Sequence, residues 1–132
     1  MTLKLLFAGK DMTSFQPLRT AFDQEDVLII SAVSLALAVF LARKNQPDLI
    51  ICEQQLIDGD GLSFFYESRN EPELAAIPFV FLLAGQQEQE DILRLLKSQH
   101  LDNKVNFLFS ENKLHRQEDI LGWRDKLLAL RN

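Results

Sequence analysis

The sequence contains very little cysteine and histidine. Its 132 residues include one cysteine, Cys52, and two histidines. A single cysteine excludes an internal disulfide and any zinc site made of several cysteines, and two histidines are too few for a histidine-rich metal centre. We therefore expect no metal and no cofactor. The lone thiol lies within an apolar run, which predicts a buried, inert side chain, and its isolation is typical of proteins of the reducing cytoplasm.

Positive charge and long hydrophobic segments are also scarce. Fourteen basic residues stand against nineteen acidic ones, which gives a net charge of −5. An acidic domain without a basic cluster has no electrostatic attraction to nucleic acid or to an anionic membrane. The longest uncharged run, Val27 to Ala42, is shorter than the ~20 residues of a membrane-spanning helix, and it changes from β-branched to helix-forming residues halfway. We predict no direct nucleic-acid partner and no membrane span.

Hydrophobic residues nevertheless make up 47% of the chain, which is enough to form the core of one domain spanning residues 1–132. Short apolar runs alternate with longer amphipathic ones. The predicted strands are Leu3–Ala8, Val27–Ser31, Asp48–Cys52, Phe79–Leu83 and Val105–Phe109. The predicted helices cover roughly residues 14–22, 34–44, 61–69, 88–96 and 118–130.

This alternation predicts an α/β fold of the (βα)5 type. Such a chain forms a doubly wound, five-stranded parallel sheet with right-handed crossovers and helices on both faces. Ligand sites in these sheets gather at the carboxyl ends of the strands. Here those ends are residues 9–11, the loop after Glu53, residues 83–85 and residues 110–111.

The middle of the chain resembles the receiver domain of two-component response regulators. The segment from Pro47 to Leu62 is similar to the family's third strand, acceptor loop and third helix start, with Asp60-Gly61 at the family's spacing. The segment from Arg69 to Ala84 is similar to the following helix end, Ile-Pro turn and fourth strand. The resemblance implies a flavodoxin-like receiver fold with strand order 2-1-3-4-5.

The acceptor and metal-binding positions of that family are changed in this chain. Receivers accept a phosphoryl group on an aspartate at the end of the third strand, where this chain has Glu53. The acidic pair after the first strand, which helps to hold Mg²⁺, falls at Gly9 and Lys10. A shift of one residue retains a single acid, Asp11. These three positions and Glu53 belong to the pocket that the resemblance implies.

The remaining pocket positions are altered as well. The resemblance assigns a hydroxyl side chain to Leu83 and a lysine to Ser110, and neither residue here has that chemistry. The switch aromatic of the fifth strand is kept as Phe107, which we expect to pack on Leu83 in a single arrangement. Glu53 is one methylene longer than aspartate, so it either imitates the phosphorylated state or is the remnant of a decayed site.

These changes favour a degenerate receiver that acts in a signalling pathway by protein contact, without phosphorylation and without enzymatic activity. Two alternatives stay open. The chain could be a phospho-acceptor with unconventional chemistry, or a sensor that binds a small ligand in the altered pocket. Fold alone does not choose among them.

The second predicted helix carries apolar residues where receivers have charged ones. Leu37 and Phe40 are three residues apart and would lie together on its outer face. Either this face binds a protein partner or a second copy of the chain, or neighbouring loops cover the helix more deeply than usual.

Overall fold

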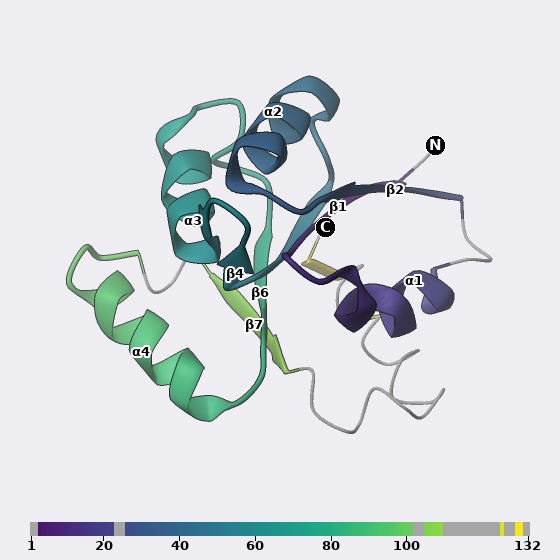
Figure 1. The fold of residues 1–132 in the computed structure, drawn as a ribbon. Coiled ribbons are helices and arrows are strands. Elements are labelled where there is room, and N and C mark those ends of the chain that lie inside the picture. The colour runs from purple at the N-terminus through teal and green to yellow at the C-terminus, as the bar shows by residue number, and fades with distance from the viewer. Residues whose placement is uncertain (1–2, 23–25, 102–104, 110–124, 126–128, 131–132) are drawn as a thin grey trace.

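The computed structural model describes residues 3–22, 26–101, 105–109, 125 and 129–130. Its elements follow the predicted alternation of strands and helices (Figure 1). In chain order they are β1 (Leu3–Ala8), the 3-10 helix η1 (Met12–Phe15), α1 (Gln16–Ala21), β2 (Val27–Ala32), α2 (Leu35–Asn45), β3 (Leu49–Glu53), β4 (Gln55–Leu56), β5 (Gly59–Asp60), α3 (Gly61–Asn70), β6 (Phe79–Leu83), α4 (Gln86–Lys97) and β7 (Asn106–Phe109).

The five long strands form one parallel sheet in the order β2-β1-β3-β6-β7. This is the order 2-1-3-4-5 when only these strands are counted, so the predicted α/β topology is confirmed. The bounds of β1 and β6 are those predicted, β2 and β7 differ by one residue at one end, and β3 is shifted by one residue at both ends. The short strands β4 and β5 form a separate antiparallel hairpin, which the sequence analysis did not predict.

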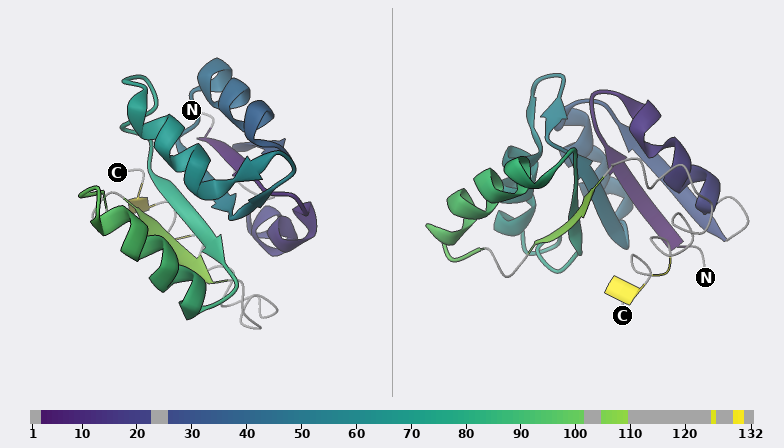
Figure 2. Two further views of the ribbon diagram at one scale, coloured as in Figure 1. Left: turned by 60° about the vertical axis from the view of Figure 1, so that its left-hand side comes forward. Right: turned by 90° about the horizontal axis from the view of Figure 1, so that it is seen from below.

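Helices cover both faces of the sheet (Figures 1 and 2). Buried residues of α2, α3 and α4 share one hydrophobic cluster with the strands, while η1 and α1 contribute to a second cluster on the opposite face. Covering both faces requires apolar side chains in both directions along a strand, and all five residues of β6 are buried for this reason. Among the described residues, no helix has the length and apolar character that crossing a membrane requires.

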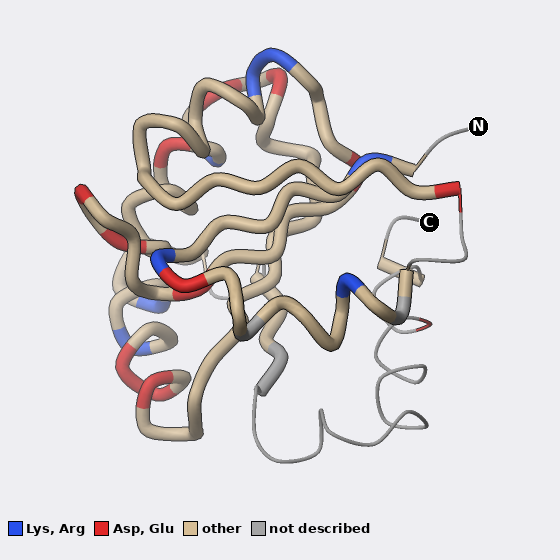
Figure 3. Tube along the Cα trace, turned by 45° about the vertical axis from the view of Figure 1, so that its right-hand side comes forward, with Lys and Arg blue, Asp and Glu red and all other residues tan. Residues whose placement is uncertain are grey.

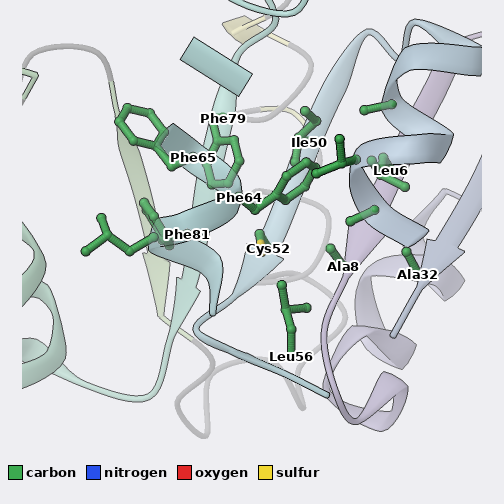
Figure 4. Packing of buried hydrophobic residues seen from close by; sticks show 14 of the residues in the cluster. Leu6, Ala8, Ala32, Ile50, Cys52, Leu56, Phe64, Phe65, Phe79 and Phe81 are labelled. Atoms are coloured by element: carbon green, nitrogen blue, oxygen red, sulfur yellow. The ribbon is translucent and has the colours of Figure 1, made fainter. Parts of the chain in front are cut away.

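Phenylalanine dominates the core under α3 (Figure 4). The rings of Phe65 and Phe79 meet edge to face with centroids 5.2 Å apart, and Phe79 lies 5.0 Å from Phe81. Arg69 closes the end of α3 because its guanidinium donates hydrogen bonds to the carbonyl oxygens of Leu74 and Ile77. These hydrogen bonds hold the segment that follows α3 against the end of the helix.

The last predicted helix lies mostly outside the described residues, as does Ser110. Of its predicted apolar stripe, Leu130 is described, and it packs against the cluster that contains Phe7 and Phe15.

Candidate functional site

Glu53 ends the central strand β3, between the carboxyl ends of β1 and β6. Its carboxylate lies directly over Gly9, the first residue after β1. A Cβ atom at Gly9 would stand 2.2 Å from Oε1 of Glu53 and 2.8 Å from the ring of Phe15. No described glycine has a positive φ, so space and not backbone conformation requires glycine here. The absence of a side chain at Gly9 makes room for the buried Oε1 of Glu53.

The neighbouring acid, Asp11, is engaged by the backbone. Its Oδ1 accepts hydrogen bonds from the N–H of Thr13 at 3.0 Å and from the hydroxyl of Thr13 at 2.8 Å. These bonds hold the pKa of Asp11 below its ordinary value of 3.8, the backbone bond contributing most. Asp11 thereby caps η1, while the exposed Lys10 donates its backbone N–H to the carbonyl of Gln55 at 2.8 Å.

The position that the resemblance assigns to a hydroxyl side chain is apolar and closed. Leu83 is fully buried at the end of β6, in the cluster against which the half-buried Phe107 packs. The ring of Phe107 stacks on Phe81 with centroids 6.0 Å apart and an angle of 22° between planes. The expected direct contact between Leu83 and Phe107 stays a prediction, but both side chains belong to one apolar cluster.

An open hollow of about 200 Å³ lies beside Glu53. The residues that line it are Glu53, Gln54, Gln55, Leu82, Ala84 and Glu88. The sequence predicted residue 88 only as the start of a helix, and the place of Glu88 in this hollow was not foreseen. Its position could have been inferred from the sequence, because parallel strands end at one edge of the sheet and α4, which contains Glu88, begins three residues after β6. Two glutamates, Glu53 and Glu88, therefore contribute to the wall of this hollow.

Asp60 and Gly61 form the start of α3. Oδ1 of Asp60 accepts a hydrogen bond from the N–H of Ser63 at 2.7 Å, which makes it the N-cap. A Cβ at Gly61 would stand 2.5 Å from the backbone oxygen of Glu53. The side chain of Gln54 accepts the N–H of Leu62 at 3.0 Å. The motif therefore fixes the loop that carries Glu53.

Asp58 caps a different helix. Its carboxylate accepts hydrogen bonds from the backbone N–H groups of Leu35 and Ala36 at the start of α2. The bond from Leu35 is the main reason that the pKa of Asp58 lies below its ordinary value. A hydrogen bond of 3.0 Å from the N–H of Ile57 to the carbonyl of Val33 also holds the β4–β5 hairpin near the start of α2.

Cys52 is completely buried, as predicted. Its Sγ donates to the backbone oxygen of Glu53 at 3.0 Å. Burial raises the pKa of the thiol, and the charges of Glu53 and Asp60 raise it further. A thiol held in its protonated form is a poor nucleophile, which agrees with the inert side chain that the sequence predicts.

Comparison with solved structures decides the fold. The chain superimposes on the chemotaxis response regulator CheY4 of Vibrio cholerae with a TM-score of 0.75 and 15% identity, covering 96% of this chain and 99% of CheY4. For the phosphorylated cyanobacterial phytochrome response regulator RcpA the TM-score is 0.75 at 18% identity, with 98% and 96% covered. For the receiver domain of the Francisella response regulator 1452 it is 0.72 at 18% identity, with 98% and 96% covered.

The chain has the receiver fold of response regulators. In sequence, it is 33% identical over 78 residues to the KDP operon transcriptional regulatory protein KdpE of Escherichia coli. That match covers 59% of this chain and 33% of KdpE, so it spans about a third of the relative's length. No family model matches the chain.

Of the residues predicted for the altered pocket, Gly9, Lys10 and Asp11 follow β1, and Glu53 and Leu83 end β3 and β6 at the same edge of the sheet. Phe107 lies within β7, and Ser110 is outside the described residues. The structure brings Gly9 and Glu53 into contact and places Leu83 at the end of the next strand. Within the described residues, no three acidic, histidine or cysteine side chains converge on a possible metal position.

The apolar surface predicted on the second helix, which is α2, is exposed to solvent. Leu37 is 39% exposed and Phe40 is 56% exposed, so the alternative that neighbouring loops bury these side chains is wrong. Whether a partner binds them stays a prediction.

Proposed function

We propose that this receiver-fold domain works in a two-component signalling pathway through protein contact, without accepting a phosphoryl group and without enzymatic activity. The observation that carries the proposal is the position of the Glu53 carboxylate over Gly9. In the family that the chain resembles, acids after the first strand hold the Mg²⁺ needed at the acceptor. Here glycine takes one such place, and the side chain at the acceptor position fills the space.

The other groups around Glu53 point the same way. A phosphoryl group is stabilised by charge-assisted hydrogen bonds from hydroxyl, ammonium and backbone donors, and by a divalent cation. Leu83 offers no donor from its side chain, and Asp11 is held by Thr13 at the start of η1. Glu88 adds a second negative charge to the hollow. Each feature makes an acyl phosphate on Glu53 less stable.

The test is incubation of the full chain with acetyl phosphate and Mg²⁺, followed by intact mass measurement. We expect no mass increase, and no saturable NMR shifts around Glu53 when Mg²⁺ or beryllofluoride is added. A matched control is the Glu53→Gln variant, which keeps the length of the side chain and cannot form an acyl phosphate. A gain of one phosphate that disappears in Glu53→Gln would show that the chain is an active phospho-acceptor and overturn the proposal.

A further inference from the structure

The outer face of α2 carries a continuous apolar stripe. Leu37, Phe40 and Lys44 follow one another at spacings of three and four residues, so they lie within roughly 60° of each other around the helix. Phe40 is 56% exposed, and the ammonium of Lys44 lies 5.9 Å from its ring centroid. Arg43, three residues after Phe40, lies at one flank of the stripe, where it pairs with Glu71. The stripe faces away from the buried residues of the helix, which are Ala38, Val39 and Ala42.

Two further exposed apolar residues lie near the start of α2, Val33 before the helix and Ile57 in the β4–β5 hairpin. Val33 and Ile57 are 36% and 63% exposed, and their backbones are joined by a hydrogen bond. We define the α2 face as Val33, Leu37, Phe40, Lys44, Ile57 and Asp58. It contains four of the six large hydrophobic residues that are exposed in the described part of the chain, the other two being Leu28 and Leu95.

The α2 face has opposite charges at its two ends. Asp58 lies at the N-terminal end, where its carboxylate binds the backbone of Leu35 and Ala36. Lys44 lies in the last turn of the helix, which also contains Arg43. Figure 3 shows in blue and red how basic and acidic residues are distributed along the chain. An acidic residue, the apolar stripe and a basic residue thus follow one another along the helix axis. If a second copy lies antiparallel to the first, the acidic end of each face meets the basic end of the other. The face is therefore complementary to itself.

We propose that the α2 face binds a second copy of this chain, with the two α2 helices antiparallel about a two-fold axis between Leu37 and Phe40. In that arrangement Leu37 of each copy packs on Phe40 of the other. Lys44 of each copy reaches Val33 and Asp58 at the start of the other helix. The arrangement is isologous, so it closes at two copies. The proposal goes beyond the proposed function and does not depend on whether Glu53 accepts a phosphoryl group.

Two physical terms decide how strong this dimer is. The net charge of −5 on each copy opposes association, but charges separated by more than ~8 Å are largely screened at physiological ionic strength. We therefore expect the local burial of apolar side chains on each copy to outweigh the long-range repulsion. A patch of this size gives an interface at the small end of the range, so we expect a weak dimer that forms with rising protein concentration.

The first experiment is sedimentation equilibrium of the full chain from micromolar to millimolar concentration, with NMR spectra recorded on dilution. We expect a monomer–dimer equilibrium, and dilution shifts confined to residues 33–44 and 55–60. A chain that stays monomeric throughout this range would overturn the proposal. So would dilution shifts that map to α4 and β7 instead, because receivers commonly pair through that side of the sheet.

Variants give the second experiment. In Leu37→Glu with Phe40→Glu, the new glutamate at position 37 stands three residues after the N-cap Ser34 and completes a capping box, so α2 should stay folded. We expect this variant, checked by circular dichroism, to lose at least about tenfold in association constant. Lys44→Glu, which changes no core residue, should also weaken the dimer by placing glutamate near Asp58 of the other copy.

The matched control is Leu95→Glu, which puts the same charge on a 50% exposed leucine of α4 outside the α2 face. It should leave the association constant unchanged. The proposal is overturned if the folded double variant associates like the parent chain, or if Leu95→Glu abolishes the dimer. If the double variant unfolds, Lys44→Glu and the dilution spectra of the parent chain still decide the question.

Discussion

Replacing Gly9 with alanine should destabilise the protein. The new Cβ would stand 2.2 Å from Oε1 of Glu53 and 2.8 Å from a ring carbon of Phe15. The carboxylate ends a flexible side chain and can turn aside. The ring of Phe15 is fully buried and stacks on Phe7 with centroids 5.0 Å apart, so it can move only by disturbing the core. Overpacking of this kind typically costs about 1–3 kcal/mol, and we expect Gly9→Ala to fall in that range.

A double-mutant cycle separates the two contacts. In the Glu53→Ala background the carboxylate is gone and the contact with Phe15 remains. Gly9→Ala should then cost less than it does in the parent chain, by a coupling energy of at least about 0.5 kcal/mol. The cost that is left measures how far the Phe15 ring can yield.

Urea unfolding followed by circular dichroism gives the free energies, provided that all variants share one m-value. The control is Gly85→Ser, because a Cβ at Gly85 meets no atom within 4 Å and serine is favoured at this N-cap. It should change the stability by no more than about 0.5 kcal/mol. If Gly9→Ala is as stable as the parent, or costs the same in both backgrounds, then the carboxylate of Glu53 does not occupy the space over Gly9.

Three further predictions concern other parts of the fold. Relaxation-dispersion NMR should find no millisecond exchange shared by Leu83 and Phe107, because both belong to one apolar cluster with a single arrangement; shared exchange would contradict a fixed switch. The lowered pKa of Asp58 means that its charge stabilises the fold above the ordinary value of 3.8, and that this contribution is lost as the pH falls towards the lowered value. Asp58→Asn should therefore lower the melting temperature at neutral pH and reduce the loss of stability on acidification, and an unchanged acid profile would contradict the cap. His100 has a φ of 58° after α4, where its N–H bonds to the carbonyl of Lys97, so His100→Gly should raise the free energy of unfolding by about 0.5–1 kcal/mol. A loss of stability on urea titration would show that the histidine side chain makes a contact that outweighs the backbone strain.

The architecture could be predicted because its signals are local and repeated. Each long strand is an uninterrupted apolar run, and alternation with amphipathic segments limits the topology to a few arrangements. The β4–β5 hairpin gives no such signal, since two residues per strand are too few to show a period of two. Its role depends on Asp58 meeting the start of α2, which lies 22 and 23 residues away in sequence.

The positions of the site residues in the fold could be predicted from the sequence, but the contacts of their side chains could not. Glu53, Gly9 and Leu83 could be placed at the carboxyl edge of the sheet because parallel strands end there. Sequence alone could not show that the carboxylate of Glu53 turns towards Gly9, because this depends on the rotamer and on the buried ring of Phe15 beside it. For the same reason Asp11 was counted as a possible metal ligand, although Thr13 holds its carboxylate at a helix start.

Gly9 and Glu53 are therefore better understood as one coupled pair than as two independent positions. The extra methylene of glutamate needs space that a side chain at position 9 would take, and glycine supplies that space. Restoring aspartate at position 53 alone would leave an unfilled gap over Gly9 and still lack the neighbouring acid. Restoring an acid at position 9 alone would force two carboxylates and the ring of Phe15 into the same volume. We therefore expect either single substitution to be unfavourable, and the fully buried Leu83 would still offer no side-chain donor to a phosphoryl group.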